Sequence, residues 1–379
     1  MKIEYIAPCL FGLESVLAGE VKRMGGEDVK VYDGKVEFSG EINLLARANL
    51  TLRTAERVLV KLGEFNARSF TELFDNVRAL PLEQFIGKKD AFPVKGYALH
   101  STLHSVPDCQ KIIKKAAVER LHEKYGVSWF EETGPVHQLQ FSILKDRATI
   151  MLDTSGAGLH KRGYRKNANE APIKETLAAG MLDLAFVKKD TQLYDPFCGS
   201  GTIIIEAALR ALNLPAGINR TFAAEKWDAV PGSVWKEERA RGLDLIRRDA
   251  RFCAFGSDID RSAVELALDN AHKAGVAERV RIRIRDVRDF KVPEGPATVV
   301  TNPPYGERLL DIEQARAIEE MMGKVFWRGT TGYYIISPDE EFESHFGRKA
   351  NKKRKLYNGM LRCNFYMYYG NRLPKDSVK

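Results

Sequence analysis

The sequence predicts an α/β protein in which a doubly wound, Rossmann-like domain follows a smaller α+β module. Two observations support this prediction. From Thr191 onward, short apolar runs typical of buried strands alternate regularly with longer amphipathic helical patterns. Before residue 155 that alternation is absent, and short strand-like runs are mixed with helical patterns of different length.

The front module is predicted to be α+β. Its helical patterns cover Ser15 to Lys22 and Asp108 to Tyr125, and the longer one places apolar residues on a single face. Its strand-like runs are Lys30-Val31 with Val36 to Phe38, Val136 to Leu144, and Ala148 to Leu152. The basic, glycine-containing stretch GAGLHKRGYRKN at 156–167 then breaks the pattern, which indicates a linker.

The second half contains five strand candidates and three helical patterns in alternation. The strands are Leu193–Phe197, Phe252–Gly256, Val280–Ile284, Ala297–Val300 and Gly332–Ser337, and the helices are Thr202–Leu212, Arg261–Ala274 and Ile312–Trp327. Alternating strands and helices predict a parallel sheet with helices on both faces. Ligands of such folds bind at the carboxyl ends of the strands.

Composition excludes some classes of protein and leaves others open. No apolar run among the 379 residues approaches the ~20 needed to span a bilayer, and Glu4 and Glu14 interrupt the start where a signal peptide is apolar. We therefore expect a cytoplasmic protein. Five scattered cysteines without a CxxC pair favour neither a zinc site nor a disulfide framework, so no metal is expected. The net charge of +8 suits a polyanionic partner or a mildly basic enzyme.

The first strand of the second half ends in the glycine-rich segment DPFCGSGT, Asp195 to Thr202. Glycines at a strand end let a ligand approach the backbone. A dinucleotide fingerprint needs a third glycine at position 204, which is Ile, and an acidic residue ~20 positions on, whereas Asp258 follows Gly199 by 59. A P-loop needs Gly-Lys-Ser/Thr, which does not follow.

Three further strand ends carry polar residues. Asp258 is placed to accept hydrogen bonds from ribose hydroxyls, and Asp286 to accept from an adenine amino group, although either could be a helix N-cap. The fourth strand runs into TNPPYGER at 301–308, where two prolines stiffen the turn that presents Asn302 and Tyr305. Such a turn is suited to hold a flat, hydrogen-bonding ligand.

In this order DPFCGSGT, GSDID, RDVRDF and TNPPYGER resemble motifs I to IV of class I S-adenosylmethionine-dependent methyltransferases, and Ala171 to Ala178 resembles motif X. APCLFGLE at 7–14 and RGYR at 162–165 are similar to THUMP-domain RNA methyltransferases, of which the bacterial large-subunit rRNA guanine-N2 enzymes are the most similar type. The resemblance covers nearly the whole chain. It implies a ferredoxin-like segment (1–44), a THUMP domain (45–155), a linker with motif X (156–190) and a methyltransferase domain (191–379).

The resemblance also implies the site residues. S-adenosylmethionine is expected to be bound by residues of these motifs: Thr176, Asp195, Phe197, Gly199, Gly201, Asp258, Ile259, Asp286, Val287 and Asn302. Methyl transfer is expected at Asn302, Pro303, Pro304 and Tyr305. The Asn302 oxygen and the Pro303 carbonyl can hold the N–H groups of a base amine and stabilise its developing positive charge. Tyr305 can stack on the base, a contact worth ~1–3 kcal/mol.

A base paired within a helix cannot reach this turn, so the target should be unpaired or flipped out. We expect RNA phosphates to be bound by the basic run Arg348 to Lys355, in particular Lys352, Lys353 and Arg354. That run should precede a hairpin whose two-residue turn is Asn358-Gly359. Three linker residues are interpreted in the same way: Arg162, Tyr164 and Arg165.

Other interpretations stay open at this stage. Transfer RNA is an alternative to ribosomal RNA, N6-adenine methylation uses the same NPPY turn, and a non-catalytic RNA-binding factor could share the fold. Trp227 and Trp235, in the insertion 213–247, could line the base pocket or anchor a core. Cys198 is expected to be a small side chain facing the sheet rather than a nucleophile. The sequence leaves open the target nucleotide, the RNA structure required, any direct RNA contact of the THUMP-like module, and the oligomeric state.

Overall fold

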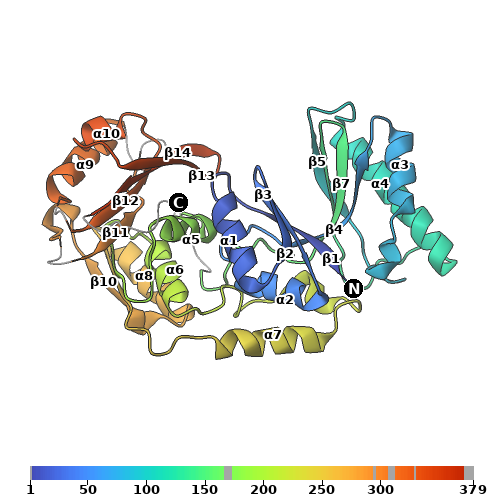
Figure 1. The fold of residues 1–379 in the computed structure, drawn as a ribbon, viewed down its shortest axis with the longest axis horizontal. Coiled ribbons are helices and arrows are strands. Elements are labelled where there is room, and N and C mark those ends of the chain that lie inside the picture. The colour runs from blue at the N-terminus through green and yellow to red at the C-terminus, as the bar shows by residue number, and fades with distance from the viewer. Residues whose placement is uncertain (1, 166–172, 293–295, 306–311, 328–329, 371–379) are drawn as a thin grey trace. The chain divides into compact units, whose positions relative to one another are not determined.

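The computed structural model describes residues 2–165, 173–292, 296–305, 312–327 and 330–370. The chain forms two compact units, one comprising 1–9, 18–159 and 220–241, and the other 10–17, 160–219 and 242–379. Figure 1 follows the chain through both. Among the described residues no helix has the length and apolarity to cross a membrane.

The first unit is built on a seven-stranded sheet of order β2-β3-β1-β4-β7-β6-β5. Its pairings are antiparallel except for the parallel pair β5 and β6. The strands are β1 (Ile3–Pro8), β2 (Glu27–Tyr32), β3 (Lys35–Gly40), β4 (Leu59–Asn66), β5 (Val94–Leu99), β6 (Leu139–Leu144) and β7 (Arg147–Asp153). The helices are α1 (Glu14–Met24), which the unit boundary divides, α2 (Ile42–Thr51), α3 (Phe70–Ala79) and α4 (Val106–Tyr125), with a 3-10 turn at Leu82–Gln84.

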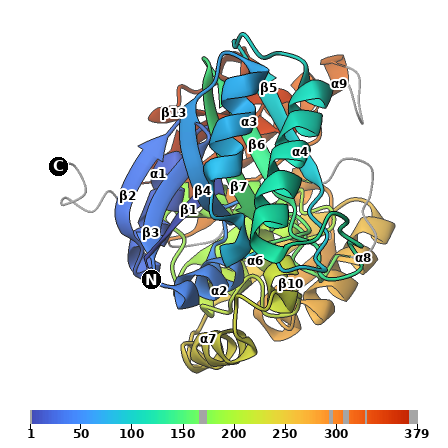
Figure 2. The ribbon, with the colours of Figure 1, turned by 90° about the vertical axis from the view of Figure 1, so that its right-hand side faces the viewer.

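Figure 2 shows α3 and α4 packed together over one face of the β4 to β7 half of this sheet. Helix α4 begins two residues before the predicted start because the Ser105 side chain accepts from the Asp108 N–H as an N-cap. It ends at Gly126, which adopts a left-handed conformation (φ 64°) suited to a helix C-terminus.

The insertion 213–247 supplies core anchors to the first unit. Its described elements are a 3-10 turn at Ala223–Lys226 and helix α7 (Gly232–Asp244). Trp227 is buried and stacks on His137, with ring centroids 4.3 Å apart, and Trp235 stacks on Phe222 at 5.4 Å. The core interpretation of the two tryptophans is therefore confirmed, and neither lines the cleft described below.

The second unit contains a seven-stranded sheet of order β10-β9-β8-β11-β12-β14-β13. The first five strands run parallel, and the last two form an antiparallel hairpin. The strands are β8 (Gln192–Asp195), β9 (Cys253–Asp258), β10 (Val280–Ile284), β11 (Thr298–Thr301), β12 (Gly332–Ser337), β13 (Lys352–Asn358) and β14 (Leu361–Tyr368). The helices are α5 (Glu175–Leu184), α6 (Thr202–Ala211), α8 (Arg261–Lys273), α9 (Ile312–Val325) and α10 (Phe342–His345), with 3-10 turns at Ala277–Arg279 and Val287–Asp289.

Helices cover both faces of this sheet (Figure 1). Val300 and Tyr334 pack into the apolar cluster that contains α5, α6 and α8, whereas their neighbours Val299 and Tyr333 pack into the cluster that contains α9 and α10. Successive strand residues point to opposite faces, so both faces are apolar cores. The predicted doubly wound fold is confirmed, and its strand order reverses between β8 and β11, where such folds bind ligands.

Candidate functional site

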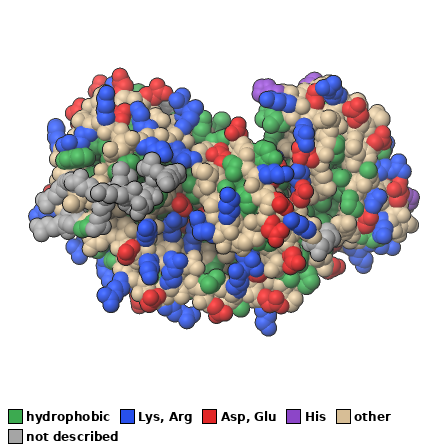
Figure 3. Space-filling model, viewed as in Figure 1, with side chains coloured by type: hydrophobic (Ala, Val, Ile, Leu, Met, Phe, Trp, Pro, Cys, Tyr) green, Lys and Arg blue, Asp and Glu red, His purple; other side chains and the backbone are tan. Residues whose placement is uncertain are grey.

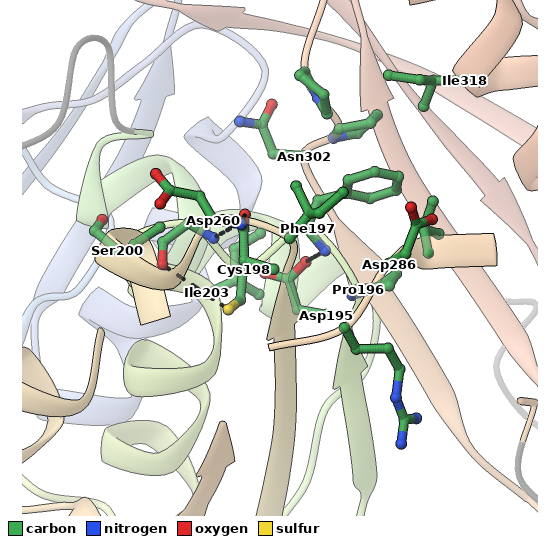
Figure 4. A pocket seen from close by; sticks show the side chains of 18 of the residues that line it. Asp195, Pro196, Phe197, Cys198, Ser200, Ile203, Asp260, Asp286, Asn302 and Ile318 are labelled. Atoms are coloured by element: carbon green, nitrogen blue, oxygen red, sulfur yellow. Dashed lines mark hydrogen bonds between the residues drawn. The ribbon is translucent and has the colours of Figure 1, made fainter. Parts of the chain in front are cut away.

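A cleft of about 880 Å³ lies at the carboxyl ends of the parallel strands. Its walls come from the segments that follow β8, β9, β10 and β11, together with one side of α9. Figure 4 shows the side chains that these segments direct toward it. The four strand ends singled out in the sequence therefore meet at one place.

The first wall is the glycine loop between β8 and α6. Gly199 (φ 48°) and Gly201 (φ 82°) have left-handed backbones that favour glycine. A Cβ on Gly201 would come 3.0 Å from Ala267 Cβ, whereas a Cβ on Gly199 would project into open space. Gly201 thus allows close packing of the loop on α8, and Gly199 keeps the surface clear for a ligand.

Asp195 ties this loop to the neighbouring strand. Its carboxylate accepts from Thr301 Oγ1 at the end of β11 (2.6 Å) and from the Phe197 N–H (3.2 Å). The second bond turns the chain and ends β8 two residues before the predicted end. Burial raises the pKa of Asp195 to about 7. Asp195 lines the cleft and also fixes the relative position of two of its walls.

The acidic strand ends already hold backbone groups. Asp258 accepts from the Gly199 N–H (2.9 Å) and the Asp260 N–H (3.0 Å). Asp286 accepts from the Arg288 N–H (2.8 Å), and the Arg288 side chain lowers the pKa of Asp286. Both aspartates line the cleft, so each combines the capping role weighed from the sequence with access to a ligand. Ile259 and Val287 line it beside them.

The NPPY turn forms the opposite side of the cleft. Asn302 Oδ1 is buried and has no hydrogen-bond partner among the described residues. A buried acceptor without a partner costs free energy and is uncommon outside functional sites. In Figure 4 the Asn302 amide extends into the cleft above Phe197, and rotation about χ2 exchanges the positions of its oxygen and nitrogen. The phenol oxygen of Tyr305 accepts from Asn358 Nδ2 at 2.6 Å.

Motif X supports the glycine loop from behind. Thr176 is fully buried in the first turn of α5 and does not line the cleft, whereas Ile173 does. Arg165 pairs with Glu175 at 3.0 Å and donates to Thr202 Oγ1 at 3.2 Å, which links α5 to the start of α6. Motif X residues 166–172 lie outside the described residues.

The prediction that Arg162 and Tyr164 bind RNA is wrong. The Arg162 side chain is only 2% exposed and forms a two-pronged ion pair with Glu206, whose side chain is fully buried, at 3.3 Å for each contact. The Tyr164 hydroxyl donates to the same carboxylate at 3.2 Å. These groups join the linker to α6 inside the second unit. Arg165 is nearly buried in its pair with Glu175, so its prediction fails for the same reason.

The basic run is a strand rather than a segment before a hairpin. Lys352 to Asn358 form β13, and Asn358 pairs with Leu361, so the two-residue turn is Gly359-Met360 and not Asn358-Gly359. Gly359 has φ 67°, as the first position of a type II′ turn requires. β13 is the last strand of its sheet, where lysines discourage pairing with other chains.

Two of the three predicted cations of this run have partners within the unit. Arg354 donates to the Gly12 carbonyl (2.6 Å) and to Ser15 Oγ (3.0 Å), and Lys353 pairs with Glu343 (2.7 Å). Lys352 is exposed, and RNA binding by it stays a prediction.

Two other groups bear on the chemistry. Cys198 is buried, and burial raises its thiol pKa well above the ordinary value, which argues against a nucleophile. Glu319, Asp339 and His345 lie close enough together to hold a metal ion, but they are joined by direct hydrogen bonds from His345 Nδ1. The expectation that no metal is used therefore stays a prediction.

Sequence reasoning missed several residues of the site. Most of them lie beside the motifs or on the inner side of α9: Ile173, Ser200, Asp260, Ser262, Ala317, Ile318 and Met321. The apolar spacing of α9 could have indicated those on its surface. Asn358 could not have been found, because its Asn-Gly pair suggested only a turn.

Matches to three family models cover most of the chain. Residues 4–59 match the RlmL ferredoxin-like domain, 67–153 the THUMP domain, and 162–367 the RMKL-like methyltransferase domain.

Similar proteins extend these matches. The chain is 43% identical to the Bacillus subtilis protein YpsC, over 99% of this chain and 98% of that protein. It is 33% identical to the ribosomal RNA large subunit methyltransferase K/L of Psychromonas ingrahamii, over 95% of this chain but only 49% of that protein, so it spans about half that enzyme's length.

Solved structures agree with the fold. SMU.472 in complex with SAH superimposes with a TM-score of 0.92 at 39% identity, covering 98% of this chain and 99% of that one. A Listeria monocytogenes protein described as a predicted N6-adenine-specific DNA methylase superimposes with a TM-score of 0.93 at 45% identity, covering 98% of this chain and 97% of that one.

Proposed function

This chain belongs to the RMKL-like methyltransferase family, and on that premise we propose that it methylates the N2 amino group of a guanine in large-subunit ribosomal RNA in the cytoplasm. The observation that carries the proposal is Asn302 Oδ1, a buried acceptor without a partner in the cleft of an S-adenosylmethionine-dependent enzyme. An amino group of a base is the kind of donor that this oxygen lacks.

The cleft fits the cofactor. S-adenosylmethionine, when bound, supplies a methyl group on a positively charged sulfur. The surface left clear by Gly199 suits its methionine part, Asp258 suits the ribose hydroxyls, and Asp286 suits the adenine amino group. These assignments place the ribose and adenine at successive strand ends, in the order β9 and β10, as the doubly wound fold provides.

Asn302 and Pro303 activate the target. The lone pair of an exocyclic amine is delocalised into the base, so the nitrogen is a weak nucleophile. The Asn302 oxygen and the Pro303 carbonyl each accept one N–H bond, which favours a localised lone pair and stabilises positive charge as the nitrogen–carbon bond forms. The methylated nitrogen then loses its proton to water, so no basic side chain is required at the turn.

Two features support RNA as the substrate. The chain carries a THUMP domain, and the enzyme from Psychromonas ingrahamii that it resembles acts on large-subunit ribosomal RNA. On the face shown in Figure 3, Lys and Arg side chains are interspersed with acidic ones, a distribution that gives moderate rather than strong attraction to a polyanion. Recognition of a particular RNA shape is consistent with such a surface.

The test is methyl transfer by the purified protein from labelled S-adenosylmethionine to RNA fractions isolated from a strain that lacks the gene. We expect label in the large-subunit fraction, with N2-methylguanosine as the labelled nucleoside by mass spectrometry. N6-methyladenosine, or label confined to transfer RNA, would keep the cofactor and overturn the substrate. Calorimetric binding of S-adenosylmethionine without transfer to any RNA would indicate a binding factor instead.

A further inference from the structure

The β13–β14 hairpin extends past the edge of the sheet on the side of the cleft. Ser337, the last residue of β12, lies level with Asn364 of β14, which in turn pairs with Lys355 of β13. β13 continues for three residues beyond that level, about 10 Å at the usual rise per residue. Because β13 runs in the same direction as β12, this extension lies at the carboxyl edge, where the NPPY turn is.

The alternation of the strand directs one polar side chain of the extension inward. Leu356 and Asn358 are buried, whereas Lys355 is exposed. Leu356 packs in the apolar core beside α5 and α6. Asn358 is 4% exposed and donates to the phenol oxygen of Tyr305 at 2.6 Å, across 53 positions in sequence.

The turn does not explain why this residue is asparagine. Asn358 lies within β13 and does not have a positive φ, and the turn's requirement for a left-handed residue is met by Gly359. A buried amide is costly unless it is hydrogen-bonded. The contact with Tyr305 is therefore the feature of the structure that accounts for a polar side chain at this position.

We infer that Asn358 is a positioning residue for the reaction, because it fixes the ring of Tyr305 in the orientation that stacks on the target base. The inference rests on the stacking role that the proposed function gives Tyr305. A ring held at its hydroxyl loses rotational freedom before the RNA arrives, so less entropy is lost on binding and the base is delivered in register with the methyl donor.

The kinetic test compares Asn358→Leu, which keeps the size of the side chain and removes the donor, with Asn364→Leu. Asn364 is a matched control because it lies on the same hairpin and donates to another tyrosine, Tyr366, at 3.5 Å. We expect kcat/KM for RNA to fall about tenfold in the first variant and less than twofold in the second. Calorimetric affinity for S-adenosylmethionine should change by less than twofold in both.

A double-mutant cycle separates positioning from a structural effect. Tyr305→Phe keeps the ring and removes the oxygen, so Asn358→Leu should produce no further loss in that background. An equal loss with and without the Tyr305 oxygen, or a variant within twofold of the wild type, would overturn the inference.

A second readout needs no catalysis, so it is decisive even where the proposed function fails. Crystal structures of the wild type and of Asn358→Leu should show the Tyr305 ring in one orientation in the first and in several in the second. A ring equally ordered in both would refute the positioning role, whereas absence of methyl transfer by the wild type would refute only the proposed substrate.

Discussion

Replacement of Arg162 by Met should destabilise the second unit while leaving RNA affinity nearly unchanged. The guanidinium and the Glu206 carboxylate are both buried and contact each other through two atoms of each group. Met fills similar space without the charge, so Glu206 would be left as an unpaired anion beside the Tyr164 hydroxyl.

The magnitude follows from that burial. Removal of one partner of a buried ion pair typically costs ~3–5 kcal/mol, since the remaining charge has lost both water and its counterion. With an m-value of about 3 kcal/mol per molar urea, the midpoint of unfolding should fall by about 1–2 M. The double variant Arg162→Met with Glu206→Leu should recover most of this loss, because replacing both charges removes the desolvation penalty.

Urea unfolding followed by circular dichroism measures the effect, and Arg261→Met is the matched control. Arg261 pairs with Glu265 at 3.1 Å on the surface of α8, where both side chains are more than two-thirds exposed and the pair is worth well under 1 kcal/mol. Equal midpoints for the two variants would refute the argument. So would a tenfold loss of RNA affinity in Arg162→Met at unchanged stability, which would restore the surface role inferred from the sequence.

Three further predictions concern the cleft and its surroundings. Asn302→Ala should lower kcat by ~10²–10³ with calorimetric cofactor affinity retained, and full activity would contradict the acceptor role. Asp195 has its pKa raised from 3.8 to about 7, so it favours folding below pH 4 and less so as pH rises through 7. Asp195→Asn should match the wild type in unfolding free energy near pH 4 and exceed it at pH 8 by at most about 4 kcal/mol, whereas a pH-independent difference would contradict that shift. Replacing both exposed Lys352 and Lys355 by Ser should reduce the salt dependence of RNA binding by up to about two phosphate contacts, while Lys353→Ser should change it less because Lys353 pairs with Glu343; equal effects would contradict phosphate binding.

The elements that position the cleft could be predicted because their signals are local. The apolar runs and amphipathic helices of residues 191–337 determine the parallel strands, and glycine, aspartate and proline at the strand ends indicate the motifs. Strand ends shifted by one to two residues where a side chain turns the chain, as Asp195 does by accepting from the Phe197 N–H.

The errors involved long-range pairing. Charged side chains are exposed by default, and nothing in the order of residues shows that Arg162 meets Glu206, 44 positions later, inside the core. The lysines of β13 resembled an RNA-binding loop because an edge strand also tolerates lysine. Asn358 was assigned to a turn for the same kind of reason, since its partner Tyr305 lies 53 positions away.

The most direct measurement of the central claim is the amount of N2-methylguanosine in large-subunit ribosomal RNA from a strain lacking the gene, complemented with the wild-type gene or with Asn302→Ala. The account predicts that the nucleoside is reduced in the deletion strain, returns with the wild type and does not return with the variant. Unchanged N2-methylguanosine in all three strains, or restoration by Asn302→Ala, would contradict it.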